Sequence, residues 1–159
     1  MVAAGALTAF GRVRASLSML DYTPPALRVE LDFLEGLVLL SQPGELRLGE
    51  VRKLERRLFR QQRRFGPALS GMLAAARALR TNDKPAAALS KAEAACDLAD
   101  MRGLAAVARW AHGMVDGGAA GEHMAAEAAR WLAQEGAVSP ERFARLWLMP
   151  WTLAQPHPG

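Results

Sequence analysis

The stretch that decides the fold spans residues 84–150 and reads KPAAALSKAEAACDLADMRGLAAVARWAHGMVDGGAAGEHMAAEAARWLAQEGAVSPERFARLWLMP. It consists of short, alanine-rich segments separated by Asp, Gly and Ser-Pro, without the apolar–polar alternation that is typical of strands. Small side chains allow neighbouring helices to approach one another closely. We therefore expect helical hairpins that are stacked side by side.

The composition of the whole chain agrees with a helical fold. The chain has 159 residues, of which 51% are hydrophobic, 23% charged and 6% aromatic. A chain of this length can bury a core without a metal or a disulfide. Alanine and leucine supply much of the apolar share, and this favours helix over sheet. The predicted fold class is all-α.

Periodicity and breakers predict about seven or eight antiparallel helices. They belong to a single helical-repeat domain over 1–148, with 1–22 as a loosely attached first helix. The tail 149–159 contains three prolines and is expected to be irregular. The predicted helices span 3–20, 26–40, 45–64, 67–81, 85–100, 102–116, 120–135 and 140–148.

The spacing of the helices predicts a repeat architecture. The helices that begin near 67 and 102 start about 35 residues apart, and a second helix follows each after a tight turn. This period is typical of tetratricopeptide-like α-solenoids. Ala88, Ala92 and Ala95 lie where such a repeat needs small residues, but Ala75 and Ala78 stand where bulky ones are usual. The pattern is therefore that of a degenerate repeat.

Cysteine usage and hydropathy indicate a cytoplasmic protein without membrane contact. Cys96 is the only cysteine, so no internal disulfide can form and a reducing compartment is the simplest interpretation. The N-terminal charges follow the apolar residues, which is the reverse of a secretory signal. The longest strongly apolar run, 37–40, is too short to span a bilayer.

Positive charge is concentrated in one predicted helix. Residues 45–64 hold eight basic and three acidic residues, so this segment has a net charge of +5. The whole chain has a net charge of +4, and the rest of the chain is therefore near −1. Three interpretations stay open: a solvated structural face, a docking site for an acidic protein surface, and a nucleic-acid site. Against nucleic acid, no aromatic stacking platform accompanies the arginines, and the glutamates would repel phosphates. The arginines of the expected partner-binding site are Arg52, Arg56, Arg60, Arg63 and Arg64.

The tryptophans add a second candidate surface. Trp131 is spaced as a core residue of the helix over 120–135. Trp147 and Trp151 belong to an apolar cluster at the end of the last predicted helix. This cluster either closes the helical stack or pairs with another subunit or domain. Trp147 and Trp151 therefore join the expected partner-binding residues.

No catalytic, metal or cofactor site is expected. His112 with Asp116 and His123 with Glu127 are spaced to share helix faces, but nothing suggests the third ligand that zinc needs. The loop GGAAG at 117–121 follows a helix and lacks the Lys-Ser/Thr of a phosphate-binding loop. Its glycines are expected to end the preceding helix. Cys96 is interpreted as a small core residue.

An ordered set of short motifs over about 30–150 resembles a known family. The motifs are Asn82-Asp83, Ala99-Asp100-Met101, Gly117-Gly118-Gly121, Ala128 with Trp131, Gly136, Pro140 with Arg142, and Pro150. This set is similar to the C-terminal helical region of large myxobacterial serine/threonine protein kinases and related signalling ATPases. The resemblance implies a tetratricopeptide-like scaffold for protein interactions. The kinase motifs themselves are absent, and the usual ending is replaced by Pro150-Trp151.

These observations predict a non-enzymatic scaffold or adaptor that uses a helical-repeat surface with one basic helix. Its partner would be another protein with an acidic surface, in a homo- or hetero-oligomer. The main alternative is a nucleic-acid-binding protein that uses the Arg-rich helix 45–64. A structural subunit of a larger assembly is the third interpretation.

Overall fold

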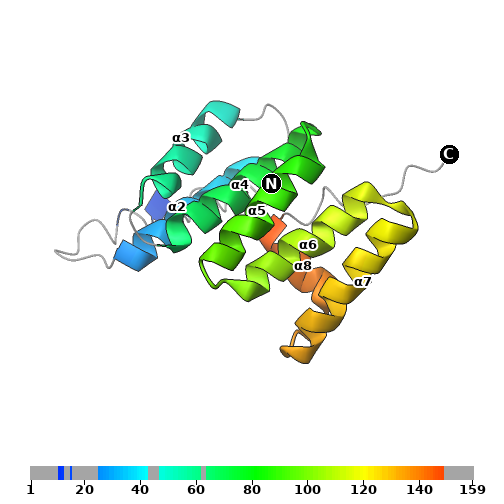
Figure 1. Ribbon diagram of the computed structural model, residues 1–159. Helices are drawn as coiled ribbons and strands as arrows, with labels where there is room; N and C mark the ends of the chain where they lie inside the picture. Colours follow the sequence, from blue (N-terminus) through cyan, green and yellow to red (C-terminus); the bar gives the residue numbers. More distant parts are fainter. Residues whose placement is uncertain (1–10, 13–14, 16–24, 43–46, 62–63, 149–159) are drawn as a thin grey trace.

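The computed structural model describes residues 11–12, 15, 25–42, 47–61 and 64–148 (Figure 1). These residues form seven helices and no strand, which confirms the all-α prediction for them. The expected first helix lies largely outside the described residues, and the tail 149–159 lies entirely outside them. The helices are α2 (Pro25–Leu40), α3 (Leu48–Phe59), α4 (Phe65–Thr81), α5 (Pro85–Leu98), α6 (Arg102–Asp116), α7 (Gly118–Gln134) and α8 (Pro140–Leu148).

The basic helix is shorter than predicted, and its boundary at 64 is wrong. The amide of Arg60 still donates to the carbonyl of Arg56, but the amide of Gln61 donates to Leu58, which tightens the last turn and ends α3. Arg64 therefore precedes the next helix. That helix begins at Phe65, two residues before Pro67, because the first turn leaves amides without helical partners and so tolerates proline.

Tight turns join the later helices. The glycines at 117–118 end α6 as expected: both adopt positive φ, and the amide of Gly117 donates to the carbonyl of Gly113. Asn82 and Asp100 take left-handed conformations after α4 and α5. The chain thus reverses direction within a few residues at each of these points.

Small side chains place α4 at the centre of the bundle. Its buried residues include Ala68, Ala75 and Ala76, and Gly71 faces the backbone of Ala92 in α5. As Figure 1 shows, α4 lies among the other helices, and it contacts α2, α3, α5, α6 and α8. The expected nesting of helices through alanines is therefore present in this part of the chain.

The hairpin of α6 and α7 is pinched at two glycines. A methyl group at Gly113 would meet the backbone of Gly121 and Ala125, and one at Gly121 would meet the carbonyl oxygen of Gly113. The two backbones therefore touch near the turn, which larger residues would prevent. This contact constrains the angle between α6 and α7.

The last helix returns to the first described one. Trp147 of α8 stacks on the buried Phe33 of α2, with ring centroids 5.9 Å apart and planes inclined by 28°. α8 also contacts α4, α6 and α7. In an open repeat stack each hairpin contacts only its neighbours. Here α8 contacts α2, α4 and α6, which are helices of different hairpins.

Candidate functional site

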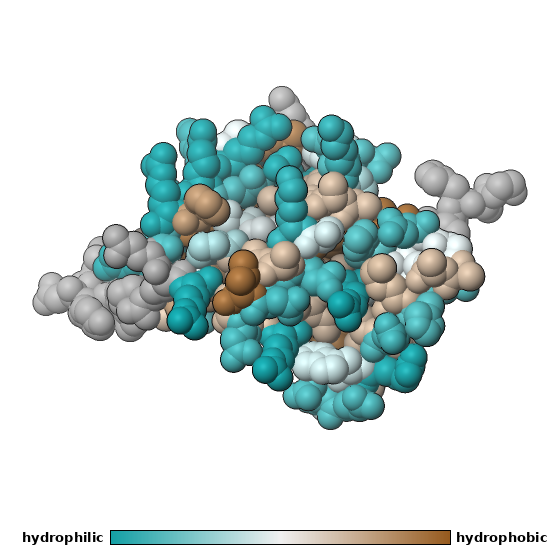
Figure 2. Space-filling view, viewed as in Figure 1, coloured by the Kyte–Doolittle hydropathy of each residue, from teal (hydrophilic) through white to brown (hydrophobic). Residues whose placement is uncertain are grey.

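The amphipathic pattern of α3 separates a buried face from a basic one. Val51, Leu54 and Leu58 are buried against the core. The opposite side exposes cations, and Figure 2 shows hydrophilic side chains at the upper left of the molecule, where Figure 1 places α3. We call this side the basic face. It consists of Arg52, Lys53, Arg56, Arg57 and Arg60.

The two glutamates of α3 pair with arginines that do not belong to the basic face. Glu55 Oε1 accepts a hydrogen bond from Nε of Arg77 in α4 at 2.6 Å, and both side chains are largely buried. Glu50 accepts one from Nε of Arg47 at 2.9 Å, in an exposed pair. Each of these glutamates is thus paired with its own arginine, which weakens the repulsion that was expected between them and an anionic partner.

Four cations of the basic face are free to bind an anion. Arg57 is engaged, since its Nη1 donates to the buried carboxylate of Asp32 at 3.1 Å. The other cations form no ion pair with the described part of the chain. A shallow hollow crosses them and is lined by Lys53, Arg56, Arg57, Arg60 and Gln61. Clustered like charges repel one another, so an anion laid across them lowers the electrostatic free energy.

An exposed aromatic residue lies at one edge of the basic face. Phe59 is 68% exposed, although it belongs to a helix whose other large apolar residues are mostly buried. At helical spacing it adjoins Arg52 and Arg56. Sequence reasoning missed it, but the signal was available: Phe59 falls off the stripe formed by the buried residues. It places one aromatic side chain beside the arginines, where no stacking platform was expected.

The expected partner-binding residues do not form one site. Arg52, Arg56 and Arg60 share the basic face. Arg64 is exposed but lies beyond the end of α3, at the start of α4. Arg63 and Trp151 lie outside the described residues.

Trp147 belongs to a separate hollow at the end of the bundle. It is partly buried, and it lines a space of about 950 Å³ together with Phe143 and the fully exposed Val138. The turns after α5 and α7 provide half of the remaining lining, and α6 and α7 provide the other half. This hollow is a second candidate surface, and its lining is more apolar than the basic face.

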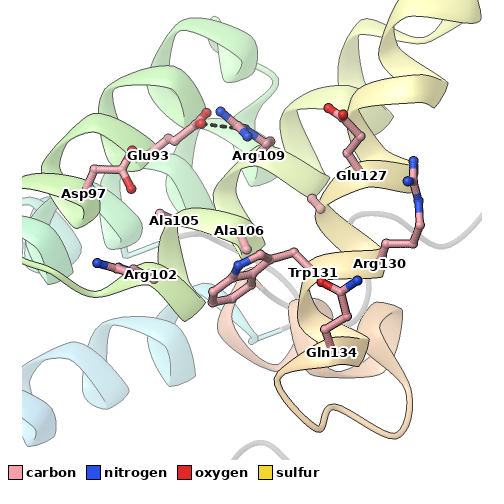
Figure 3. Close-up of a pocket in the computed structure, with 11 residues that line it drawn as sticks. Glu93, Asp97, Arg102, Ala105, Ala106, Arg109, Glu127, Arg130, Trp131 and Gln134 are labelled. Carbon is pink, nitrogen blue, oxygen red and sulfur yellow. Dashed lines mark hydrogen bonds and ion pairs between the residues drawn. The ribbon is translucent and has the colours of Figure 1, made fainter.

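A third hollow lies between α5, α6 and α7 (Figure 3). It measures about 420 Å³, and Trp131, which was expected in the core, is half-buried in its wall. Nε of Arg109 donates to Glu93 at 2.8 Å within it. Its other charges are also balanced, two carboxylates against two guanidinium groups. Its full lining is Glu93, Asp97, Arg102, Ala105, Ala106, Arg109, Glu127, Ala128, Arg130, Trp131 and Gln134.

The titratable groups singled out in the sequence lie apart from these hollows or pair locally. His112 Nε2 lies 3.3 Å from Asp116, and His123 Nε2 lies 3.7 Å from Glu127, each on its own helix. Within the described ranges no three His, Cys, Asp or Glu side chains gather as metal ligands would. Burial, with a further contribution from Asp97, raises the pKa of the Cys96 thiol to about 12. That thiol is neutral at physiological pH.

None of the described helices is both long and apolar enough to cross a membrane. Comparison with protein-family models, with curated proteins and with solved structures gave no match. The chain's own residues point to the basic face of α3 as its candidate binding surface.

Proposed function

We propose that this protein is a non-enzymatic interaction module, built as a closed tetratricopeptide-like stack, that binds an acidic segment of another protein through the basic face of α3. One observation carries the proposal. Arg52, Lys53, Arg56 and Arg60 lie on one exposed side of a helix whose own carboxylates are paired elsewhere. Such a surface attracts anionic partners and orients them.

The attachment of α3 to the bundle supports this role. Ser70 of α4 donates its hydroxyl to the carbonyl of Glu55 at 2.9 Å, close to the pair of Glu55 with Arg77. On the other flank, Arg57 binds Asp32 of α2. These contacts hold α3 on both sides. A rigid array of cations binds with a smaller loss of conformational entropy than a mobile one.

Two further expectations belong to this proposal. We place the protein in the cytoplasm because its only cysteine is a buried, neutral thiol. The resemblance to the helical region of myxobacterial kinases and signalling ATPases points to the same scaffold role. The hollow beside Trp147 is left for an additional contact with a partner or a second copy.

The test is the binding of an oligoglutamate peptide, measured by fluorescence anisotropy. We expect binding to weaken steeply from about 0.05 M to about 0.5 M salt, as the screening length falls below about 5 Å. The triple variant Arg52→Glu, Arg56→Glu, Arg60→Glu should abolish it. A control triple variant, Lys84→Glu, Lys91→Glu, Arg142→Glu, changes the net charge equally at exposed positions away from α3. Equal loss in both triple variants would contradict a specific site.

Nucleic acid is the second candidate, and the exposure of Phe59 favours it. Single-stranded binders combine cations that contact phosphates with aromatic rings on which bases stack, each stacked base contributing about 1–3 kcal/mol. A single-stranded oligonucleotide titrated against wild type and Phe59→Ala tests this function. Binding that is tighter than that of oligoglutamate at equal salt, and that weakens in Phe59→Ala, would support the nucleic-acid function instead.

A further inference from the structure

We infer that the segment bound by the basic face is an acidic α-helix, with carboxylates at every fourth residue and an apolar side chain that packs on Phe59. This inference rests on the proposed function and specifies the conformation of the partner. It draws on three features of α3: the state of its backbone, the spacing of its arginines and the relief of its surface.

The backbone of α3 favours a partner that needs no main-chain hydrogen bonds. An extended peptide gains much of its affinity by adding a strand to a sheet edge. The described residues offer no sheet edge, and the amides and carbonyls within α3 are engaged in the helix. A helical partner satisfies its own backbone and presents only side chains. The free-energy cost of removing its backbone from water is therefore smaller than that of an extended segment.

The arginine spacing matches that of a helix. Arg52, Arg56 and Arg60 are separated by four residues each, and Arg60 keeps a right-handed helical conformation at the end of α3. Successive guanidinium groups are therefore offset by about 6 Å along the axis. Carboxylates at every fourth position of a partner helix have the same offset, so each meets one arginine without bending either helix.

The shape of the basic face, with one projecting side chain and one position without a side chain, allows further contacts with a partner helix. Phe59 projects near the end of α3, and Gly49 leaves a bare spot near its start, with no atom within 4 Å of where a Cβ would stand. At helical spacing Gly49 adjoins Arg52 and Lys53. A partner helix can bring its backbone close at Gly49 and place an apolar side chain on Phe59. These two points are about 15 Å apart along the axis, or roughly three helical turns.

Two peptides of equal net charge test the inference. One carries glutamate at every fourth position and one leucine, locked as a helix of about four turns by a hydrocarbon staple. The other carries the same residues in scrambled order with a central proline and no staple. We expect the stapled helix to bind the full-length protein at least tenfold more tightly, roughly the effect of a few well-placed contacts. Equal affinity of both peptides would overturn the inference and leave the proposed function standing.

Two variants check that the contact is the one described. Phe59→Ala and Gly49→Leu should each weaken the stapled helix several-fold and leave the scrambled peptide unchanged. Both positions are exposed, so both variants are expected to fold, which circular dichroism verifies. Unchanged affinity of the stapled helix in both variants would overturn the inference. Failure of both peptides to bind wild type at low salt would overturn the proposed function as well.

Discussion

Nε of Arg77 in α4 donates a hydrogen bond at 2.6 Å to the carboxylate of Glu55 in α3. This pair joins two helices across a largely buried contact, with the Arg77 side chain 18% exposed and that of Glu55 13%. It also removes from the basic face a negative charge that helical spacing would otherwise place close to it. The same contact thus contributes to the stability of the bundle and to the charge of the surface.

Breaking this pair should destabilise the protein. Glu55→Gln leaves the guanidinium group of Arg77 partly buried without its counter-charge, and we expect a loss of about 1–3 kcal/mol. The change is measured as the midpoint of urea unfolding. Glu50→Gln removes the exposed pair with Arg47 and serves as the control, with an expected loss below about 1 kcal/mol. Equal losses of unfolding free energy in the two variants would show that burial of the Glu55 pair adds nothing to the stability of the protein.

The glycine contact between α6 and α7 should tolerate no side chain. Gly113→Ala places a methyl group against the backbone of Gly121, and neither backbone can yield as a flexible side chain would. We expect a loss of about 2–3 kcal/mol in thermal or urea unfolding, larger than the gain in helix propensity of about 1 kcal/mol. Gly103→Ala, where the Cβ meets open space, should be neutral or slightly stabilising. A stable Gly113→Ala variant would contradict the close approach.

The stacking of Trp147 on Phe33 should hold α8 against α2. Trp147→Ala removes this contact and the edge-to-face contact with Phe143, whose centroid lies 6.4 Å away. We expect a loss of about 2–3 kcal/mol, because Trp147 is only partly buried. Leu146→Ala, at a residue that is 71% exposed, should change the unfolding midpoint little. An unchanged midpoint in Trp147→Ala would show that α8 does not close the stack.

Alkaline pH should reveal the burial of Cys96. Its pKa is raised from 9.0 to about 12, so the unfolded thiol ionises at lower pH than the folded one. Below pH 9 both states are protonated and the thiol has no effect on the pH dependence of stability. Above pH 9 the unfolded state releases its proton first, so stability falls as the pH rises towards 12.

The variant Cys96→Ala isolates this contribution, since the other titrating groups are common to both proteins. We expect the stability advantage of wild type over Cys96→Ala to shrink between pH 9 and pH 11. Urea unfolding at several pH values measures it, and a constant difference would contradict the raised pKa.

The sequence was informative about helix positions because its breakers act locally. The glycines at 117–118 and Pro140 act within one turn of where they stand, and α6 and α8 have the predicted boundaries. The end of α3 was missed because the first glycine or proline after Arg60 is Gly66. There the helix ends through backbone hydrogen bonds from Arg60 to Arg56 and from Gln61 to Leu58, and no residue type in this segment predicts them.

The candidate site was predictable only in part. Spacing placed Arg52, Arg56 and Arg60 together, and the structure agrees. The pairing of Glu55 with Arg77 joins residues 22 positions apart, so the carboxylate could not be removed from the basic face by local reasoning. The return of Trp147 to Phe33 is also a long-range contact. Local periodicity carries no information about such contacts.

The most direct test of the basic face is a map of its contacts in solution. An oligoglutamate peptide is titrated into uniformly ¹⁵N-labelled protein, and the amide shifts are followed by NMR. We predict that the largest shifts fall within α3, between Leu48 and Phe59, and that they vanish in the Arg52→Glu, Arg56→Glu, Arg60→Glu variant. Shifts confined to the hollow beside Trp147, or to the one between α5 and α7, would contradict the account.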